Sequence, residues 1–269
     1  MPLPENARFV ASLREKTRRL RDPEASRSIA IVLVAMLLGC GSSEREIESG
    51  VQYEPPMERS IVVETVVDLP FDAAWSELIR RLSESSFQVS ALEKASRVVR
   101  VDLDRSSDLA AASNQPGRYA DCGRSVRTYR ETGADEDVED RFEYLVVESS
   151  RYREADPGED GYRVSDVERR VRLDASATIY LQPEGRNRTR VTVKSRYQIE
   201  IEIAGKARFV PLDRDEAPSA PESFGPRTES IRFTTFQPGT DRRQGGLTCR
   251  ATGEFEHALV ALVNPAAAF

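Results

Sequence analysis

Two stretches of alternating residues, 171–181 and 191–203, constrain the fold of this chain more than any other feature. Apolar residues occupy nearly every odd position in both stretches, and polar residues occupy every even position. Because successive side chains of a strand point to opposite faces, each stretch predicts a strand with one buried and one wet face. Turn-forming residues 182–187 join them, so the pair predicts a long antiparallel hairpin.

The region before residue 104 predicts a strand, a helix and two further strands. Residues 61–69, 87–91 and 99–103 each alternate as strands do. Between the first two, apolar residues follow the helical spacing i, i+3, i+4, i+7, and Asp72 is placed to cap the first turn. The apolar residues of this helix are Phe71, Ala74, Trp75, Leu78, Ile79 and Leu82. We expect Trp75 to anchor the helix in the core.

Other segments complete the predicted fold. Residues 104–167 predict loops with one or two strands, and 204–226, which contain four prolines, predict another loop. Residues 231–233 mark a further strand, and an apolar stripe predicts a closing helix at 255–263. We therefore expect one α+β domain over 59–265, in which a curved antiparallel sheet packs on two amphipathic helices in a helix-grip-like arrangement.

An apolar run near the N-terminus predicts an export signal. The ten residues Ile29–Leu38 carry no charge and follow several arginines. A helix of that length rises about 15 Å, half the hydrocarbon thickness of a bilayer, so a signal peptide is favoured over a membrane span. The Leu-Leu-Gly-Cys sequence that ends at Cys40 resembles the lipobox of bacterial lipoproteins, in which the cysteine is lipidated after cleavage. Its residues are Leu37, Leu38, Gly39 and Cys40. A buried strand ending in Gly-Cys is the alternative.

Residues 1–39 are accordingly expected to be a signal peptide. The basic segment before the apolar run is long for such a signal, which indicates a translation start near residue 20. Residues 40–58 are polar and contain Pro55-Pro56, which predicts a lipidated cysteine followed by a flexible tether. Gly41 and Ser42 lack the aspartate that retains enterobacterial lipoproteins in the inner membrane. An outer-membrane location facing the periplasm is therefore expected.

Charge excludes one class of partner. Residues 1–39 contain seven Lys or Arg and four Asp or Glu, and the whole chain has a net charge of −6, so residues 40–269 carry −9. Such an acidic domain is a poor match for nucleic acid, which rewards clustered cations. The acidic runs 135–140 and 156–160 lack the ligand spacing of an EF-hand loop and are expected to face water. No metal and no cofactor is expected.

The cysteine count predicts one disulfide. If Cys40 is lipidated, Cys122 and Cys249 remain as an even pair in an exported chain. Both lie in polar stretches that contain glycine, which suits a cross-link between loops or strand ends. Two unpaired buried thiols are the alternative.

The early part of the chain resembles a known family. A lipobox, a polar tether and a strand-helix-strand-strand unit over residues 58–103 are similar to those of BamC-like helix-grip lipoproteins of the outer-membrane β-barrel assembly machine. The resemblance implies an interaction or assembly role with envelope proteins as partners. No site residue of that family is carried over to this chain.

A catalytic site is not expected. His257 is the single histidine and falls opposite the apolar stripe of the closing helix, so we expect it to be solvated. Glu200 and Glu202 lie on the wet face of the hairpin, where Lys194 or Arg196 could pair with them. Two functions remain open: a non-catalytic envelope interaction module, or a helix-grip protein that binds a lipid or other hydrophobic ligand in a pocket between sheet and helices.

Overall fold

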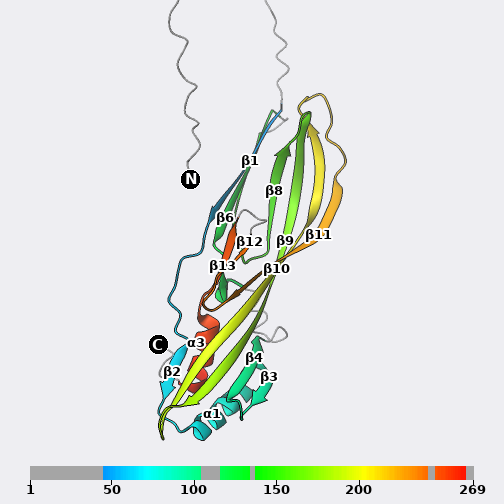
Figure 1. Cartoon of the computed structure of the whole chain (residues 1–269). Coiled ribbons are helices and arrows are strands. Elements are labelled where there is room, and N and C mark those ends of the chain that lie inside the picture. The colour runs from blue at the N-terminus through cyan, green and yellow to red at the C-terminus, as the bar shows by residue number, and fades with distance from the viewer. Residues whose placement is uncertain (1–44, 104–115, 134–136, 242–245, 265–269) are drawn as a thin grey trace, which may run out of the picture. The chain divides into compact units, whose positions relative to one another are not determined.

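The computed structural model describes residues 45–103, 116–133, 137–241 and 246–264, which all belong to one compact unit, Ser42–Phe269. Strands account for 60% of the structure and helices for 13%. The strands form three antiparallel sheets, one of seven strands and two of three (Figure 1). The expected α+β fold, a curved sheet packed on two amphipathic helices, is therefore wrong, and the described part of the chain is mostly β-sheet.

A long hairpin forms the spine of the seven-stranded sheet. Its strands, β9 (Gly161–Pro183) and β10 (Thr189–Pro211), pair along all 23 residues of each. At about 3.3 Å per residue, such a strand is on the order of 75 Å long. Shorter strands pair along both edges. They are β2 (Glu64–Val67) and β11 (Glu222–Thr234) beside β10, β4 (Val98–Leu103) and β8 (Ser150–Pro157) beside β9, and β3 (Phe87–Glu93) beside β4.

The predicted hairpin is confirmed, and it extends beyond the alternating residues. Residues 204–211, expected to be loop, continue β10 and pair with the first residues of β9. Pro211 stands at the last position of the strand, where the missing N–H interrupts no further ladder bonds. At the other end, Gly185 in the turn has a φ of +76°, a left-handed conformation that glycine adopts without strain.

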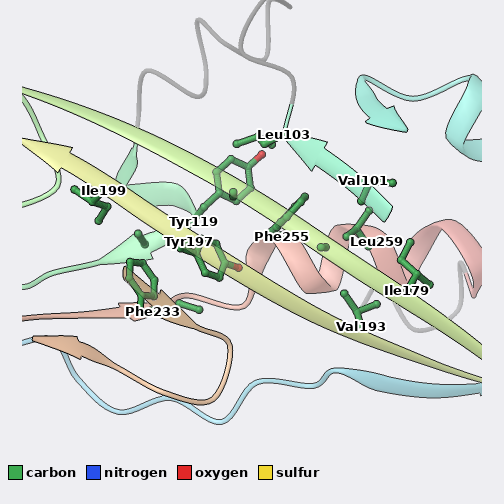
Figure 2. Close-up of a cluster of buried hydrophobic side chains, with 14 of the residues drawn as sticks. Val101, Leu103, Tyr119, Ile179, Val193, Tyr197, Ile199, Phe233, Phe255 and Leu259 are labelled. Carbon is green, nitrogen blue, oxygen red and sulfur yellow. The ribbon is translucent and has the colours of Figure 1, made fainter. Parts of the chain in front are cut away.

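Two helices pack on one part of the hairpin, on the side to which odd-numbered residues such as Ile179, Val193 and Tyr197 point. They are α1 (Phe71–Ser83) and α3 (Glu254–Val263), which contact each other, while α1 contacts β9 and α3 contacts β10. The ring of Phe255 is fully buried and lies 6.1 Å from that of Tyr119 and 6.3 Å from that of Tyr197 (Figure 2). Pro70 takes the N-cap position of α1, so Asp72 does not cap the helix and instead pairs with Lys94 at 2.8 Å.

Trp75 lies in this core, as expected, with 8% of its surface exposed. We predict that Trp75→Ala lowers the free energy of unfolding by about 3–5 kcal/mol, because the substitution removes a large buried ring and leaves a cavity. Chemical denaturation measures the change. Ser76→Ala, on the exposed side of the same helix, is the control and should shift stability by less than about 0.5 kcal/mol. Equal stability of the two variants would contradict this orientation of α1.

Two three-stranded sheets complete the fold. One consists of β1 (Glu46–Glu54), β6 (Arg124–Thr132) and β7 (Val138–Leu145), and the other of β12 (Gly239–Asp241), β13 (Leu247–Ala251) and β5 (Ala120–Asp121), with the 3₁₀ turn η1 (Pro116–Arg118) before β5. β1 falls within the stretch expected to be a tether, yet all nine of its residues pair with β6. Residues 46–54 of the expected tether are therefore part of a sheet.

Arginine and tyrosine side chains hold β6 and β7 against β8 and β9. The rings of Tyr144 and Tyr152 stack with centroids 5.8 Å apart. The guanidinium of Arg127 lies 4.0 Å from the Tyr152 ring, and that of Arg169 lies 5.3 Å from the Tyr144 ring, both in cation–π contact. Arg169 is 3% exposed and donates hydrogen bonds to two backbone carbonyls between β7 and β8. Burial raises the pKa of Tyr152 to about 12.

Candidate functional site

Of the three cysteines, the two that the sequence predicts to be paired lie in the described part of the chain. Cys122 and Cys249 form a disulfide, with their Cα atoms 4.0 Å apart and both side chains buried. Cys249 belongs to β13, which ends three residues before α3, so the bond holds the segment around Cys122 beside the start of that helix. Cys40 and the lipobox residues 37–39 lie outside the described residues.

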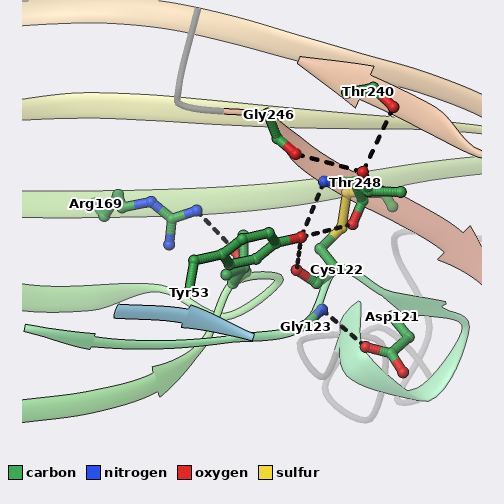
Figure 3. The surroundings of a disulfide bond; sticks show 10 residues. Tyr53, Asp121, Cys122, Gly123, Arg169, Thr240, Gly246 and Thr248 are labelled. Atoms are coloured by element: carbon green, nitrogen blue, oxygen red, sulfur yellow. Dashed lines mark hydrogen bonds between the residues drawn. A yellow bond between two sulfur atoms is a disulfide. The ribbon is translucent and has the colours of Figure 1, made fainter. Parts of the chain in front are cut away.

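Tyr53, at the end of β1, forms hydrogen bonds to the two segments that contain Cys122 and Cys249 (Figure 3). The Tyr53 hydroxyl donates to the carbonyl oxygens of Cys122 and Thr248, each 3.2 Å away. It also accepts a 2.9 Å hydrogen bond from the backbone N–H of Thr248. Desolvation by the surrounding protein raises the pKa of Tyr53. A Cβ atom on Gly123 would overlap the carbonyl oxygen of Glu54, so the chain beside Cys122 requires glycine. β1 is thus fastened at the disulfide.

Arg45, the first described residue, is bonded to the end of β10. Its backbone N–H donates to the carbonyl oxygen of Leu212 at 2.9 Å, and its guanidinium donates to that of Pro211 at 3.3 Å. The guanidinium also lies 3.7 Å from a carboxylate oxygen of Glu131. Arg45 is 9% exposed, so it is packed into the domain beside the open end of the β9–β10 hairpin.

A buried carboxylate, which the sequence analysis missed, lies between α3 and the hairpin. Glu256 is fully buried, and the hydroxyl of Tyr197 donates to its carboxylate at 2.8 Å. The hydroxyl of Thr235 donates to the same carboxylate at 2.7 Å and accepts from the backbone N–H of Ser195. Burial, and then the nearby Glu256, raise the pKa of Tyr197. The spacing Glu256, Val260, Val263 along one helix face was the signal for this position.

The helix-free side of the seven-stranded sheet carries unpaired cations. We call it the open face and define it by the even-numbered side chains of β4, β9, β10 and β11, which point away from α1 and α3. Five exposed cations on it form no ion pair within the described part of the chain: Arg100, Arg172, Lys194, Arg196 and Arg232. By contrast, Arg170 and Arg190 on the same face pair with glutamates at 3.2 and 2.7 Å. Asp102, Asp174, Glu200 and Glu202 lie on the same face, so the open face presents charges of both signs to solvent.

A cleft of about 810 Å³ opens on this face, where β3, β4, β9, β10 and β11 meet. Two of the five cations, Arg196 and Arg232, line it, and Nε of Arg232 donates to the side chain of Gln198 at 2.9 Å. Asp102 and Asp174 are the carboxylates of its lining. Uncharged polar side chains make up much of the rest, namely Gln88, Ser176, Gln198, Thr234 and Gln237. Leu103, Ala175, Tyr197, Phe233 and Pro238 complete the lining, so the cleft offers both charged and apolar surface to a ligand.

The other residues considered in the sequence analysis, His257, Glu200 and Glu202, lie at the surface. His257 is exposed on α3, as expected. Glu200 accepts a hydrogen bond from Gln198, and Glu202 lies 3.8 Å from Arg170, so neither carboxylate pairs with Lys194 or Arg196. Across the described ranges, no group of three or more His, Cys, Asp or Glu is placed to hold a metal ion. Neither helix in those ranges is long and apolar enough to cross a bilayer.

Compared with known protein families, curated proteins and solved structures, the chain has no significant match. The resemblance to BamC-like lipoproteins therefore stays a prediction. The functional conclusion rests on the residues of this chain and their geometry.

Proposed function

We propose that the protein is a lipoprotein, anchored in the outer membrane through Cys40, whose domain is a non-catalytic binding module of the cell envelope. The lipobox sequence that ends at Cys40 suggests the anchor. The observation that carries the proposal is the disulfide between Cys122 and Cys249, because such bonds persist in oxidising compartments such as the periplasm. Export through a signal peptide and a stable disulfide are consistent with each other.

The position of Arg45 supports a role close to the membrane. Only residues 41–44 separate Cys40 from Arg45, and five Cα-to-Cα steps span at most about 18 Å. A lipid on Cys40 would therefore keep the open end of the β9–β10 hairpin within that distance of the bilayer surface. Such tethering raises the local concentration of the domain near other envelope components.

Core packing favours this role over that of a carrier for hydrophobic ligands. The inward side chains of the hairpin, such as Ile179 and Val193, pack against the core that Phe255 and Leu259 of α3 help to fill (Figure 2). The 810 Å³ cleft lies on the opposite side of the sheet, and four charged residues line it together with apolar ones. A wholly apolar ligand would cover those charges without offering them hydrogen bonds.

Metabolic labelling tests the anchor. Wild-type protein expressed in a Gram-negative host is expected to incorporate labelled palmitate and to lose residues 1–39, because the thiol of Cys40 accepts the lipid before cleavage. Cys40→Ser should abolish labelling, whereas Ser43→Ala, three residues away, should leave it unchanged. Membrane fractionation should place the labelled protein with the outer membrane. A mature wild-type protein that carries no palmitate, or that retains residues 1–39, would sink the proposal.

A further inference from the structure

The cations of the open-face cleft are poised for an anionic ligand. Arg196 is exposed and forms no ion pair within the described ranges, and Arg232 there has only the neutral oxygen of Gln198 as a side-chain partner. Arg196 lies opposite Thr234, two residues from Arg232 on β11, so both arginines stand on one face of neighbouring strands. Guanidinium groups bind carboxylate and phosphate through paired, charge-assisted hydrogen bonds. The two together form a receptor for one acidic group.

The rest of the lining is suited to hydroxyl groups. Ser176, Gln198 and Thr234 lie around the arginines, and each offers both a donor and an acceptor. Asp102, on β4, lies opposite Ser176, at the side of the cleft away from β11. A carboxylate there would repel a second acidic group and accept hydrogen bonds from hydroxyls. The charges of the cleft are therefore divided, with the arginines on the side of β10 and β11 and the carboxylates of Asp102 and Asp174 on the side of β4 and β9.

We propose that this cleft binds a saccharide that carries one acidic group. The acidic group lies between Arg196 and Arg232, and the sugar hydroxyls extend across β9 toward Asp102. The volume, about 810 Å³, falls within the range of roughly 300–1,000 Å³ that is usual for small-molecule sites. This inference deepens the proposed binding role by naming the ligand class, and it does not depend on the lipid anchor.

Three related sugars test the proposal on the full chain, purified in detergent, by saturation-transfer NMR titration. N-acetylmuramic acid carries a carboxylate, N-acetylglucosamine 1-phosphate carries a phosphate, and N-acetylglucosamine carries neither. At least one acidic sugar is expected to bind about tenfold or more tightly than the neutral one, because it alone gains charge-assisted hydrogen bonds. The comparison of the two acidic sugars identifies the acidic group.

Matched variants locate the site. Arg196→Gln and Arg232→Gln are each expected to weaken binding of the preferred acidic sugar about tenfold or more. Arg172→Gln removes an unpaired cation from the same face outside the cleft, and it should change the Kd by less than about twofold. The proposal is overturned if none of the sugars binds at about 10 mM, if the neutral sugar binds equally well, or if all three variants behave alike. Palmitate labelling and sugar binding are measured in separate experiments. A failure to bind sugar therefore does not contradict the lipid anchor, and a failure of labelling does not contradict the sugar site.

Discussion

Replacing Cys122 and Cys249 together by serine is expected to lower the free energy of unfolding by about 4–5 kcal/mol. The bond joins residues separated by 127 positions, and a cross-link of that span removes much of the conformational freedom of the unfolded chain. Denaturation of the wild type and the double variant, each with and without reductant, measures the effect. Reductant should lower the stability of the wild type alone.

The loss should be largest around the disulfide. Hydrogen exchange is expected to accelerate first in α3 and at the end of β1, because the bond fixes β13 beside α3 and Tyr53 ties β1 to the same place. The β9–β10 hairpin, with its own ladder of 23 residue pairs, should exchange later. Uniform acceleration across the sheet, or equal stability of the two proteins under oxidising conditions, would contradict this account.

Stability should fall steeply above about pH 10, the ordinary pKa of tyrosine. Tyr129, Tyr152 and Tyr197 are 0%, 6% and 2% exposed, and desolvation is the main cause that raises the pKa of each. A raised pKa means that the folded protein holds the proton more tightly than the unfolded chain does. The stabilisation is therefore complete below about pH 10 and is lost as the pH rises through the folded-state pKa, which for Tyr152 is about 12.

The three tyrosines together should give a slope of about 4 kcal/mol per pH unit once the unfolded chain is deprotonated. Denaturant titrations at a series of pH values between about 9 and 11 measure this slope. Tyr152→Phe should reduce the slope by about one third, because one of the three protons is then absent. If ultraviolet absorbance shows all three phenols ionising near pH 10 while the protein stays folded, the prediction is wrong.

The sequence predicts those elements whose pattern is carried by apolar residues. The alternation of residues 171–203 identifies the hairpin, and the spacing around Trp75 and Leu78 identifies α1, with β3 and β4 after it. The hairpin, α1 and β4 bury one apolar face each, so their periodicity is readable without knowledge of their neighbours, whereas β3 has no fully buried residue.

The strands that the sequence misses have mixed surfaces. β7 alternates Arg141 and Glu143 with Phe142 and Tyr144, and β1 contains Ser49-Gly50, so neither shows a continuous apolar stripe. Their burial comes from arginine–tyrosine contacts and from pairing with strands far away in sequence. Segments that were expected to lack strands form these extra strands. The share of residues in strands is therefore larger than expected, and the fold is mostly β-sheet rather than α+β.

The candidate sites divide in a similar way. The disulfide can be predicted by counting cysteines, because lipidation of Cys40 would leave two thiols. The cleft cannot be predicted from the sequence, because only the register of β10 with β11 brings Arg196 and Arg232 together. The spacing of Glu256 with Val260 and Val263 indicates the buried face of α3, whereas its partners Tyr197 and Thr235 come from distant parts of the chain.

The pairing of β2 with β10 bears on the order in which the protein folds. Glu64 lies opposite Thr192, and β4 lies against β9, so the first third of the described chain pairs with strands that are synthesised much later. The hairpin, in contrast, joins neighbours in sequence and can close by itself. In a chain produced from its N-terminus, β4 can therefore pair only with β3 until residues 176–180 have appeared, and β2 has no partner strand until residues 189–192 follow. The apolar faces of β2 and α1 are completed later still, because α3, which contacts both, follows the hairpin in the chain.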